Sequence, residues 1–314
     1  MHPDDLFKHR EPTKEPDTMS TQTPKLLARK PEVTKQGHAK GLIFGPSGVG
    51  KTWFSLAFPK VYYIDCEGGA DLCHYQERLQ ASGGAYMGPE EGSLDFPTVI
   101  GQFKALAAGG HGFGTIVIDS VTKLYQTAIA NEAEKLGDKD AFGASKKPAV
   151  AWMRQLVNWT AKADINVWFV AHEGTEWGLD PKTGQRSEIG KIADIWDKLI
   201  YELDLTLQVQ KRGGSRVAII RKSRLTGFPE GETFPLEYSD FAERYGKDFI
   251  EAEVIPLTFA TPEEVAEVHR LLEIVKVSED EIEKGFKKAQ VDSWSEMTSE
   301  QIQNWTAYLK KKTA

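Results

Sequence analysis

A glycine-rich stretch that begins at residue 45 carries the clearest chemical signal in the chain. Residues 45 to 52 read GPSGVGKT, which fits the pattern G-x-x-x-x-G-K-[ST] of a phosphate-binding loop. Glycines let the backbone curl so that successive amides face phosphate oxygens, the lysine reaches the β- and γ-phosphates, and the last hydroxyl is a ligand for Mg²⁺. We therefore expect these residues to bind a nucleotide: Gly45, Pro46, Ser47, Gly48, Val49, Gly50, Lys51 and Thr52.

An acid at the end of an apolar run is the second chemical signal. The run TIVID at residues 115 to 119 predicts a buried strand, and Asp119 would help to hold the magnesium at its carboxyl end. The other interpretation is that Asp119 caps the helix that begins at Ser120. No carboxylate follows Asp119 directly, because Ser120 stands there. An acid that orients the attacking water must therefore come from elsewhere in the chain.

The run VYYID at residues 61 to 65 leads to a candidate for that acid. Asp65 and Glu67 lie at the carboxyl end of this strand, which we expect to neighbour the glycine-loop strand. Asp65 still belongs to the strand and can be tied into the turn before Gly68. Glu67 is therefore the predicted catalytic carboxylate. Lys51 is the second predicted catalytic residue, because it would contact the β- and γ-phosphates. The alternative is that Glu67 is an ordinary acid in a glycine-rich turn.

Short apolar runs alternate with helical segments through the middle of the chain. Strands are predicted at 41–44, 61–65, 115–119 and 166–172. This alternation is typical of a mainly parallel sheet sandwiched by helices, an α/β fold. The runs DLTLQVQ and SRVAIIRKS then alternate with a period near two on either side of KRGG, and they predict an antiparallel hairpin.

Both ends of the chain depart from this pattern. Residues 1–38 are rich in Pro, Lys, Glu and Thr, so we expect a flexible tail, with the true start at Met1 or Met19. Residues 39–258 would form the α/β domain, and 261–314 a small module of three helices. Each of these helices opens with a predicted capping box, formed by Thr261 with Glu264, Ser278 with Glu281, and Thr298 with Gln301.

Composition limits the class of protein. The 314 residues are 40% hydrophobic and 27% charged, with a net charge of −7, which argues against a basic coat for DNA but leaves a local basic groove open. No apolar run reaches the roughly 18 residues of a membrane span. Cys66, Cys73 and His74 are too few for a zinc site, and two reduced thiols indicate a cytoplasmic protein.

The motifs together resemble the RecA-like recombinase core. GPSGVGKT, YIDCEGG and VIDS, followed by a further strand with a polar end, carry this resemblance over about residues 40 to 235. More narrowly, the layout is similar to short phage and prophage RecA-like ATPases, several of which act in single-strand annealing and recombination. The resemblance implies a RecA-like P-loop core with a small C-terminal helical appendage, ATP and Mg²⁺ as cofactors, and a homo-oligomer in the host cytoplasm.

The same resemblance implies a sensor and a contact with single-stranded DNA. His172, at the end of the run NVWFVAH, would sense the γ-phosphate, although it could also simply close its strand with a local hydrogen bond. The polar segment 173–196 is expected to be a mobile surface loop, either a DNA contact or a solvated connection. Its candidate DNA contacts are Trp177, Lys182, Arg186 and Lys191.

The predicted hairpin is strongly basic. Six cations fall within fourteen residues: Lys211, Arg212, Arg216, Arg221, Lys222 and Arg224. The resemblance implies that Lys222 and Arg224 enter the ATP site of a neighbouring subunit and stabilise charge on the transferring phosphate. The alternative is a solvated hairpin with an ordinary basic turn.

Three functions fit these residues. The first is a Mg-dependent ATPase that acts on single-stranded DNA in phage recombination, annealing or replication, together with a single-strand-binding protein or another replication protein. ATP is preferred to GTP because no N-K-x-D motif is present. The second is a nucleotide-switched adaptor that recruits a replication partner through the C-terminal helices. The third is a small-molecule kinase, which is disfavoured because Arg186 is the one arginine in the segment that would serve as its lid.

Overall fold

The computed structural model describes residues 28, 30–31, 36–69, 72–141, 143–180 and 183–313. Most of the predicted N-terminal tail therefore lies outside the described residues. Within them, the strands form a nine-stranded sheet in the order β3-β2-β4-β5-β1-β7-β8-β9, with β6 paired to β5. The strands are β1 (Lys40–Gly45), β2 (Val61–Asp65), β3 (Ala85–Met87), β4 (Thr115–Asp119), β5 (Asn166–Leu179), β6 (Arg186–Ala193), β7 (Leu205–Arg212), β8 (Ser215–Ser223) and β9 (Thr233–Pro235).

The sheet is mainly parallel, as predicted, and it ends in the predicted hairpin. All pairings from β3 across to β7 are parallel, whereas β8 pairs antiparallel with β7 and β9 with β8. Helices cover both faces of the sheet. They are α1 (Lys51–Ser55), α2 (Cys73–Ser82), α3 (Phe96–Ala107), α4 (Val121–Leu136), α5 (Lys146–Lys162), α6 (Leu199–Glu202), α7 (Tyr238–Tyr245) and α8 (Lys247–Ile250), with a 3₁₀ turn at Gly137–Lys139.

The apolar runs are continuous because β1, β2, β4 and the first part of β5 are buried on both faces. Neighbouring residues of a strand point to opposite sides. Ile43 of β1 and Val117 of β4 pack on one side in the cluster that contains Phe54 of α1 and Phe241 of α7. Their neighbours along the two strands pack on the other side with apolar residues of α3, α4 and α5. The alternation thus builds two cores, one on each face of the sheet.

The position of β2 corrects one expectation from the sequence. We expected the strand that carries Asp65 to neighbour the glycine-loop strand β1, and this is wrong. Both β4 and β5 lie between them, because the parallel connections run through helices and need not join adjacent strands. All four strands are parallel, so β2 still ends at the same edge of the sheet as β1.

The predicted C-terminal segment is confirmed as a helical region with its own apolar cluster. It contains α9 (Pro262–Val275), α10 (Glu279–Ala289) and α11 (Ser299–Thr313), with a 3₁₀ turn at Trp294–Glu296. The side-chain and backbone bonds of a capping box are both present for Thr261 with Glu264 and for Thr298 with Gln301. Ser278 accepts from the backbone N–H of Glu281. The shared cluster is formed by Val268, Leu271, Val291, Trp294, Met297, Ile302 and Leu309.

Polar contacts tie these helices to α3 and α5. Lys104 Nζ lies 2.5 Å from Glu296 Oε1. Lys162 Nζ donates to the carbonyl oxygens of Ala289 at 2.9 Å and Gln290 at 2.8 Å. Among the helices of the described ranges, none has the length and apolar character that a membrane crossing requires.

Candidate functional site

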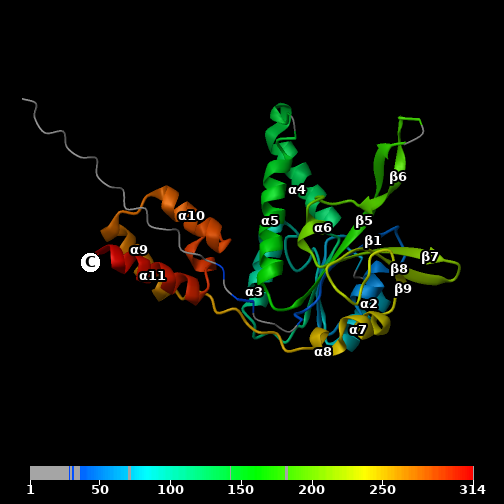
Figure 1. Ribbon diagram of the computed structural model, residues 1–314, viewed down its shortest axis with the longest axis horizontal. Coiled ribbons are helices and arrows are strands. Elements are labelled where there is room, and N and C mark those ends of the chain that lie inside the picture. Colours follow the sequence, from blue (N-terminus) through cyan, green and yellow to red (C-terminus); the bar gives the residue numbers. More distant parts are fainter. Residues whose placement is uncertain are drawn as a thin grey trace, which may run out of the picture. The chain divides into compact units, whose positions relative to one another are not determined.

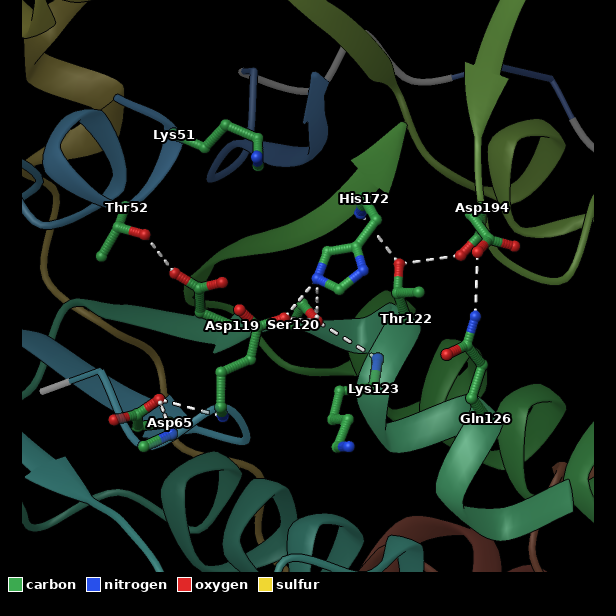
Figure 2. Close-up of polar contacts among 12 residues, drawn as sticks. Lys51, Thr52, Asp65, Asp119, Ser120, Thr122, Lys123, Gln126, His172 and Asp194 are labelled. Carbon is green, nitrogen blue, oxygen red and sulfur yellow. Dashed lines mark hydrogen bonds and ion pairs between the residues drawn. The ribbon is translucent and has the colours of Figure 1, made fainter. Parts of the chain in front are cut away.

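The carboxyl ends of four parallel strands bring the predicted site residues to one edge of the sheet (Figure 2). The glycine loop follows β1, Glu67 follows β2, Asp119 ends β4, and His172 lies in β5 directly opposite Gly45. This edge is where parallel α/β sheets place their ligands.

The glycine loop has the backbone that its motif requires. Gly48 and Gly50 adopt φ angles of +67° and +101°, in the region that favours glycine. Lys51 Nζ donates to the carbonyl oxygens of Gly45 and Pro46, each at 2.9 Å. Burial lowers the pKa of Lys51, while the nearby acids, among them Asp119, oppose that shift. The ammonium is thus held against the loop, close to the amides that would bind phosphate.

Thr52 and Asp119 form the pair expected to hold a cation. Thr52 Oγ1 donates to Asp119 Oδ2 at 2.5 Å, and the hydroxyl of the buried Tyr63 donates to the same oxygen at 3.2 Å. Burial raises the pKa of Asp119 to about 6, and the two hydroxyl donors limit that rise. The hydroxyl and carboxylate oxygens suit Mg²⁺, which usually takes further ligands from water and substrate phosphates. No cluster of three or more His, Cys, Asp or Glu suited to a metal exists among the described residues.

Glu67 is the centre of a second polar cluster. Its Oε1 atom accepts hydrogen bonds from Ser120 Oγ and from His172 Nε2, and these two donors lie 3.4 Å apart. The cluster therefore joins residues that follow β2 and β4 with a residue from the middle of β5. The Glu67 side chain is 39% exposed and that of His172 is 46% exposed, so both can be reached from solvent.

Asp65 orients the turn that carries Glu67. It is buried at 1% exposure, and its Oδ1 atom accepts the backbone N–H groups of Glu67 at 3.1 Å and Gly68 at 2.9 Å. This bonding is the role expected from the sequence. Asp65 is thus committed to the backbone, which leaves Glu67 as the acid of this turn with an exposed carboxylate.

The backbone of His172 is linked to α4 and to Asp194, which directly follows β6. The backbone N–H of His172 donates to Thr122 Oγ1 at 2.9 Å, and Thr122 Oγ1 donates to the carbonyl oxygen of Asp194 at 2.7 Å (Figure 2). Asp194 N–H in turn donates to the carbonyl oxygen of His172 at 2.9 Å. Gln126 Nε2 donates to Asp194 Oδ2 at 2.9 Å. A shift of the His172 backbone would therefore also move Asp194, directly after β6.

Comparison with known proteins gives this arrangement a family. The protein family described as "AAA domain" matches residues 38–226, more than half of the chain. The chain belongs to the AAA-domain family. A solved structure described as a prototypical ATPase from the type III secretion system of pathogenic bacteria is similar at 13% identity and a TM-score of 0.38. The alignment covers 89% of this chain and 82% of that one. No curated protein matches the sequence.

The segment after His172 corrects a second expectation. We expected a mobile loop over 173–196, but in this AAA domain β5 continues to Leu179 and pairs antiparallel with β6, forming a two-stranded β5–β6 ribbon (Figure 1). The loop prediction is therefore wrong for most of the segment. Backbone pairing with a partner strand stabilises these polar residues as strands even though they bury little apolar surface.

The candidate DNA contacts lie on this ribbon where they are described. The Trp177 side chain is 56% exposed, and the Arg186 guanidinium lies 5.6 Å from the centre of its ring. Lys191 Nζ is 2.5 Å from Glu188 Oε1, so part of its charge is balanced within the ribbon. Lys182 lies outside the described residues. DNA contact by these side chains stays a prediction.

The two cations predicted to act on a neighbouring subunit lie at the opposite edge of the sheet from the glycine loop. Lys222 Nζ donates to the carbonyl oxygen of Leu203, and burial lowers the pKa of Lys222. Arg224 donates to the carbonyl oxygen of Tyr201 and lies 3.8 Å from Asp204 Oδ1. Neither can serve the glycine loop of its own chain from there, and their role in a neighbouring subunit stays a prediction.

Replacing Ser120 by Ala should affect both stability and nucleotide hydrolysis. Ser120 Oγ accepts the backbone N–H of Lys123 at 3.1 Å as the cap of α4, so its loss should cost about 1 kcal/mol of unfolding free energy. It should also lower the hydrolysis rate, because Glu67 loses one of its two donors. Denaturant unfolding and phosphate release measure the two effects.

Ser278→Ala is the matched control for Ser120→Ala. Ser278 caps α10 through the same kind of bond, to the N–H of Glu281, in the C-terminal helical region. The Ser278→Ala variant should lose a similar amount of unfolding free energy and keep the wild-type rate of nucleotide hydrolysis. Equal rates in the two variants would contradict a role for Ser120 in the Glu67 cluster.

Proposed function

We propose that the chain is a Mg-dependent ATPase in which Glu67 positions the attacking water and takes its proton. The observation that carries the proposal is the Glu67 cluster. An exposed carboxylate, oriented by Ser120 and His172, lies at the same sheet edge as the glycine loop. Asp65 holds the turn that carries Glu67, so the carboxylate is presented in a fixed direction.

Each residue of the site has a separate role in the proposed reaction. The backbone amides of the glycine loop and Lys51 bind the phosphates, and Thr52 and Asp119 would hold Mg²⁺. When bound, Mg²⁺ neutralises charge on the β- and γ-phosphates. The water oxygen bonds to the γ-phosphorus, the bond to the oxygen bridging the β- and γ-phosphates breaks, and the water proton passes to Glu67. The products are ADP and inorganic phosphate.

We further propose that this ATPase acts on single-stranded DNA in phage recombination, annealing or replication, as a homo-oligomer. The β5–β6 ribbon supports the proposal, because it begins directly after His172 and carries the exposed Trp177 beside Arg186. Exposed aromatic rings next to cations stack on nucleic-acid bases without sequence preference. A single-strand-binding protein or another replication protein is the expected partner on the same DNA.

One feature favours a nucleotide-switched adaptor as a second candidate. A groove of about 500 Å³ lies between α10 and α11 and is lined by Trp305 and Tyr308 among others. Such a groove could take part in recruiting a partner protein. In that case nucleotide turnover would be independent of DNA, whereas the ATPase acting on DNA should be stimulated by it.

Three variants test the assignment of the catalytic carboxylate. Glu67→Gln should lower the rate of ATP hydrolysis by about 100-fold or more while ATP binding survives, because the amide cannot take the proton. Lys51→Ala should lose ATP binding. Glu243→Gln, which changes an exposed acid on α7, should match the wild type in both. Full hydrolysis by Glu67→Gln would exclude Glu67 as the base.

A tryptophan pair tests the DNA proposal. Trp177→Ala should lower the affinity for a fluorescent oligodeoxythymidine by about tenfold and reduce DNA stimulation of hydrolysis, because the ribbon loses a stacking ring. Trp152 on α5 is 36% exposed and lies outside the ribbon, so Trp152→Ala should bind DNA as the wild type does. Unchanged hydrolysis with and without DNA in the wild-type protein would favour the adaptor instead.

A further inference from the structure

The hairpin formed by β7 and β8 places an arginine against the glycine loop of its own chain. β7 pairs in parallel with β1, and β8 pairs with β7, so the turn of this hairpin lies at the same sheet edge as the loop. Arg216 is the second residue of β8. A Cβ atom placed on Gly50 would lie 3.0 Å from Arg216 Cδ, 3.2 Å from Nε and 3.6 Å from Cζ. The guanidinium group therefore packs directly on the loop.

The guanidinium of Arg216 has no bonded partner among the residues that the structure describes. Among the described residues, the Arg216 side chain makes neither a hydrogen bond nor an ion pair, whereas Arg221, Arg224 and Arg244 all bond to protein groups. Arg216 is exposed, so its donors are open to a ligand. An arginine fixed beside a phosphate-binding loop without a carboxylate partner suits an anionic ligand.

Arg216 thus lies beside the glycine loop, in contrast to Lys222 and Arg224 at the opposite edge of the sheet.

We propose that Arg216 binds the α- and β-phosphates of a nucleotide held in the glycine loop of the same chain. The backbone amides of such a loop face the α- and β-phosphates, while the lysine reaches the β- and γ-phosphates. A guanidinium that packs on Gly50 therefore meets the phosphates that ATP and ADP share. The inference rests on the proposed ATPase function and adds a binding residue to its site.

This assignment predicts a specific pattern of nucleotide binding. Arg216→Ala should weaken the binding of both ATP and ADP by about tenfold, because both lose the same charge-assisted contact. KM for ATP should rise by a similar factor, and kcat should stay within about twofold of the wild type. Titration with fluorescent ATP and ADP analogues and steady-state hydrolysis measure these constants. Arg216→Gln, which retains much of the side-chain length, should behave like Arg216→Ala.

Arg212→Ala is the matched control. Arg212 lies in the same hairpin, but Lys211 is the residue paired with Arg216, so Arg212 points to the other face of the strand pair. Removing its charge should change both affinities by less than about twofold. If Arg212→Ala weakened the binding of ATP and ADP as much as Arg216→Ala does, the hairpin would attract nucleotides only through its overall positive charge. That result would overturn the proposed contact of Arg216 with the phosphates.

The remaining outcomes separate this inference from the ATPase proposal. Wild-type affinities in a folded Arg216→Ala or Arg216→Gln, with binding lost in Lys51→Ala, would overturn the inference and leave the ATPase intact. A lower kcat with unchanged ADP affinity would also overturn it, because Arg216 would then act on the γ-phosphate. If the wild-type protein bound neither nucleotide, the ATPase proposal would fail and this inference with it.

Discussion

The parallel alignment of β1, β2, β4 and β5 is the constraint on which the rest of the site depends. Parallel strands end at one edge of the sheet, and helices bury both of its faces, so polar side chains that follow the strands collect at that edge. Lys51, Asp119 and Glu67 come from distant parts of the chain and share this edge for that reason. Burial there raises the pKa of Asp119 and lowers that of Lys51, because a buried position disfavours the charged form of each group.

Two antiparallel ribbons extend this edge on either side of the glycine loop. β1 lies between β5 and β7, and each of these strands continues into an antiparallel pair, with β6 and with β8. The first ribbon begins directly after His172, which contacts Glu67, and the second carries Arg216, which packs on Gly50. We propose that the β5–β6 ribbon responds to the γ-phosphate through His172. The β7–β8 hairpin would bind, through Arg216, the α- and β-phosphates that remain after hydrolysis.

Sequence reasoning found the residues that have a local signal and missed those that depend on strand order. The glycine loop, Asp119 and Glu67 follow apolar runs that identify buried strands. The contact of Ser120 with Glu67 could not be foreseen, because it requires that β4 lie beside β2, and we expected β1 in that place. The β5–β6 ribbon was missed for another reason. Its many charged and glycine residues do not show the alternation of apolar and polar residues that is typical of a strand. The two strands are stabilised by pairing with each other rather than by burial of apolar side chains.

A crystal structure with a non-hydrolysable ATP analogue and Mg²⁺ would show whether Glu67 faces the γ-phosphate. We expect Lys51 Nζ to leave the carbonyl oxygens of Gly45 and Pro46 for the phosphates. We also expect the Glu67 carboxylate to contact a water molecule facing the γ-phosphate. A nucleotide bound in the glycine loop with a different acid facing the γ-phosphate would contradict the account.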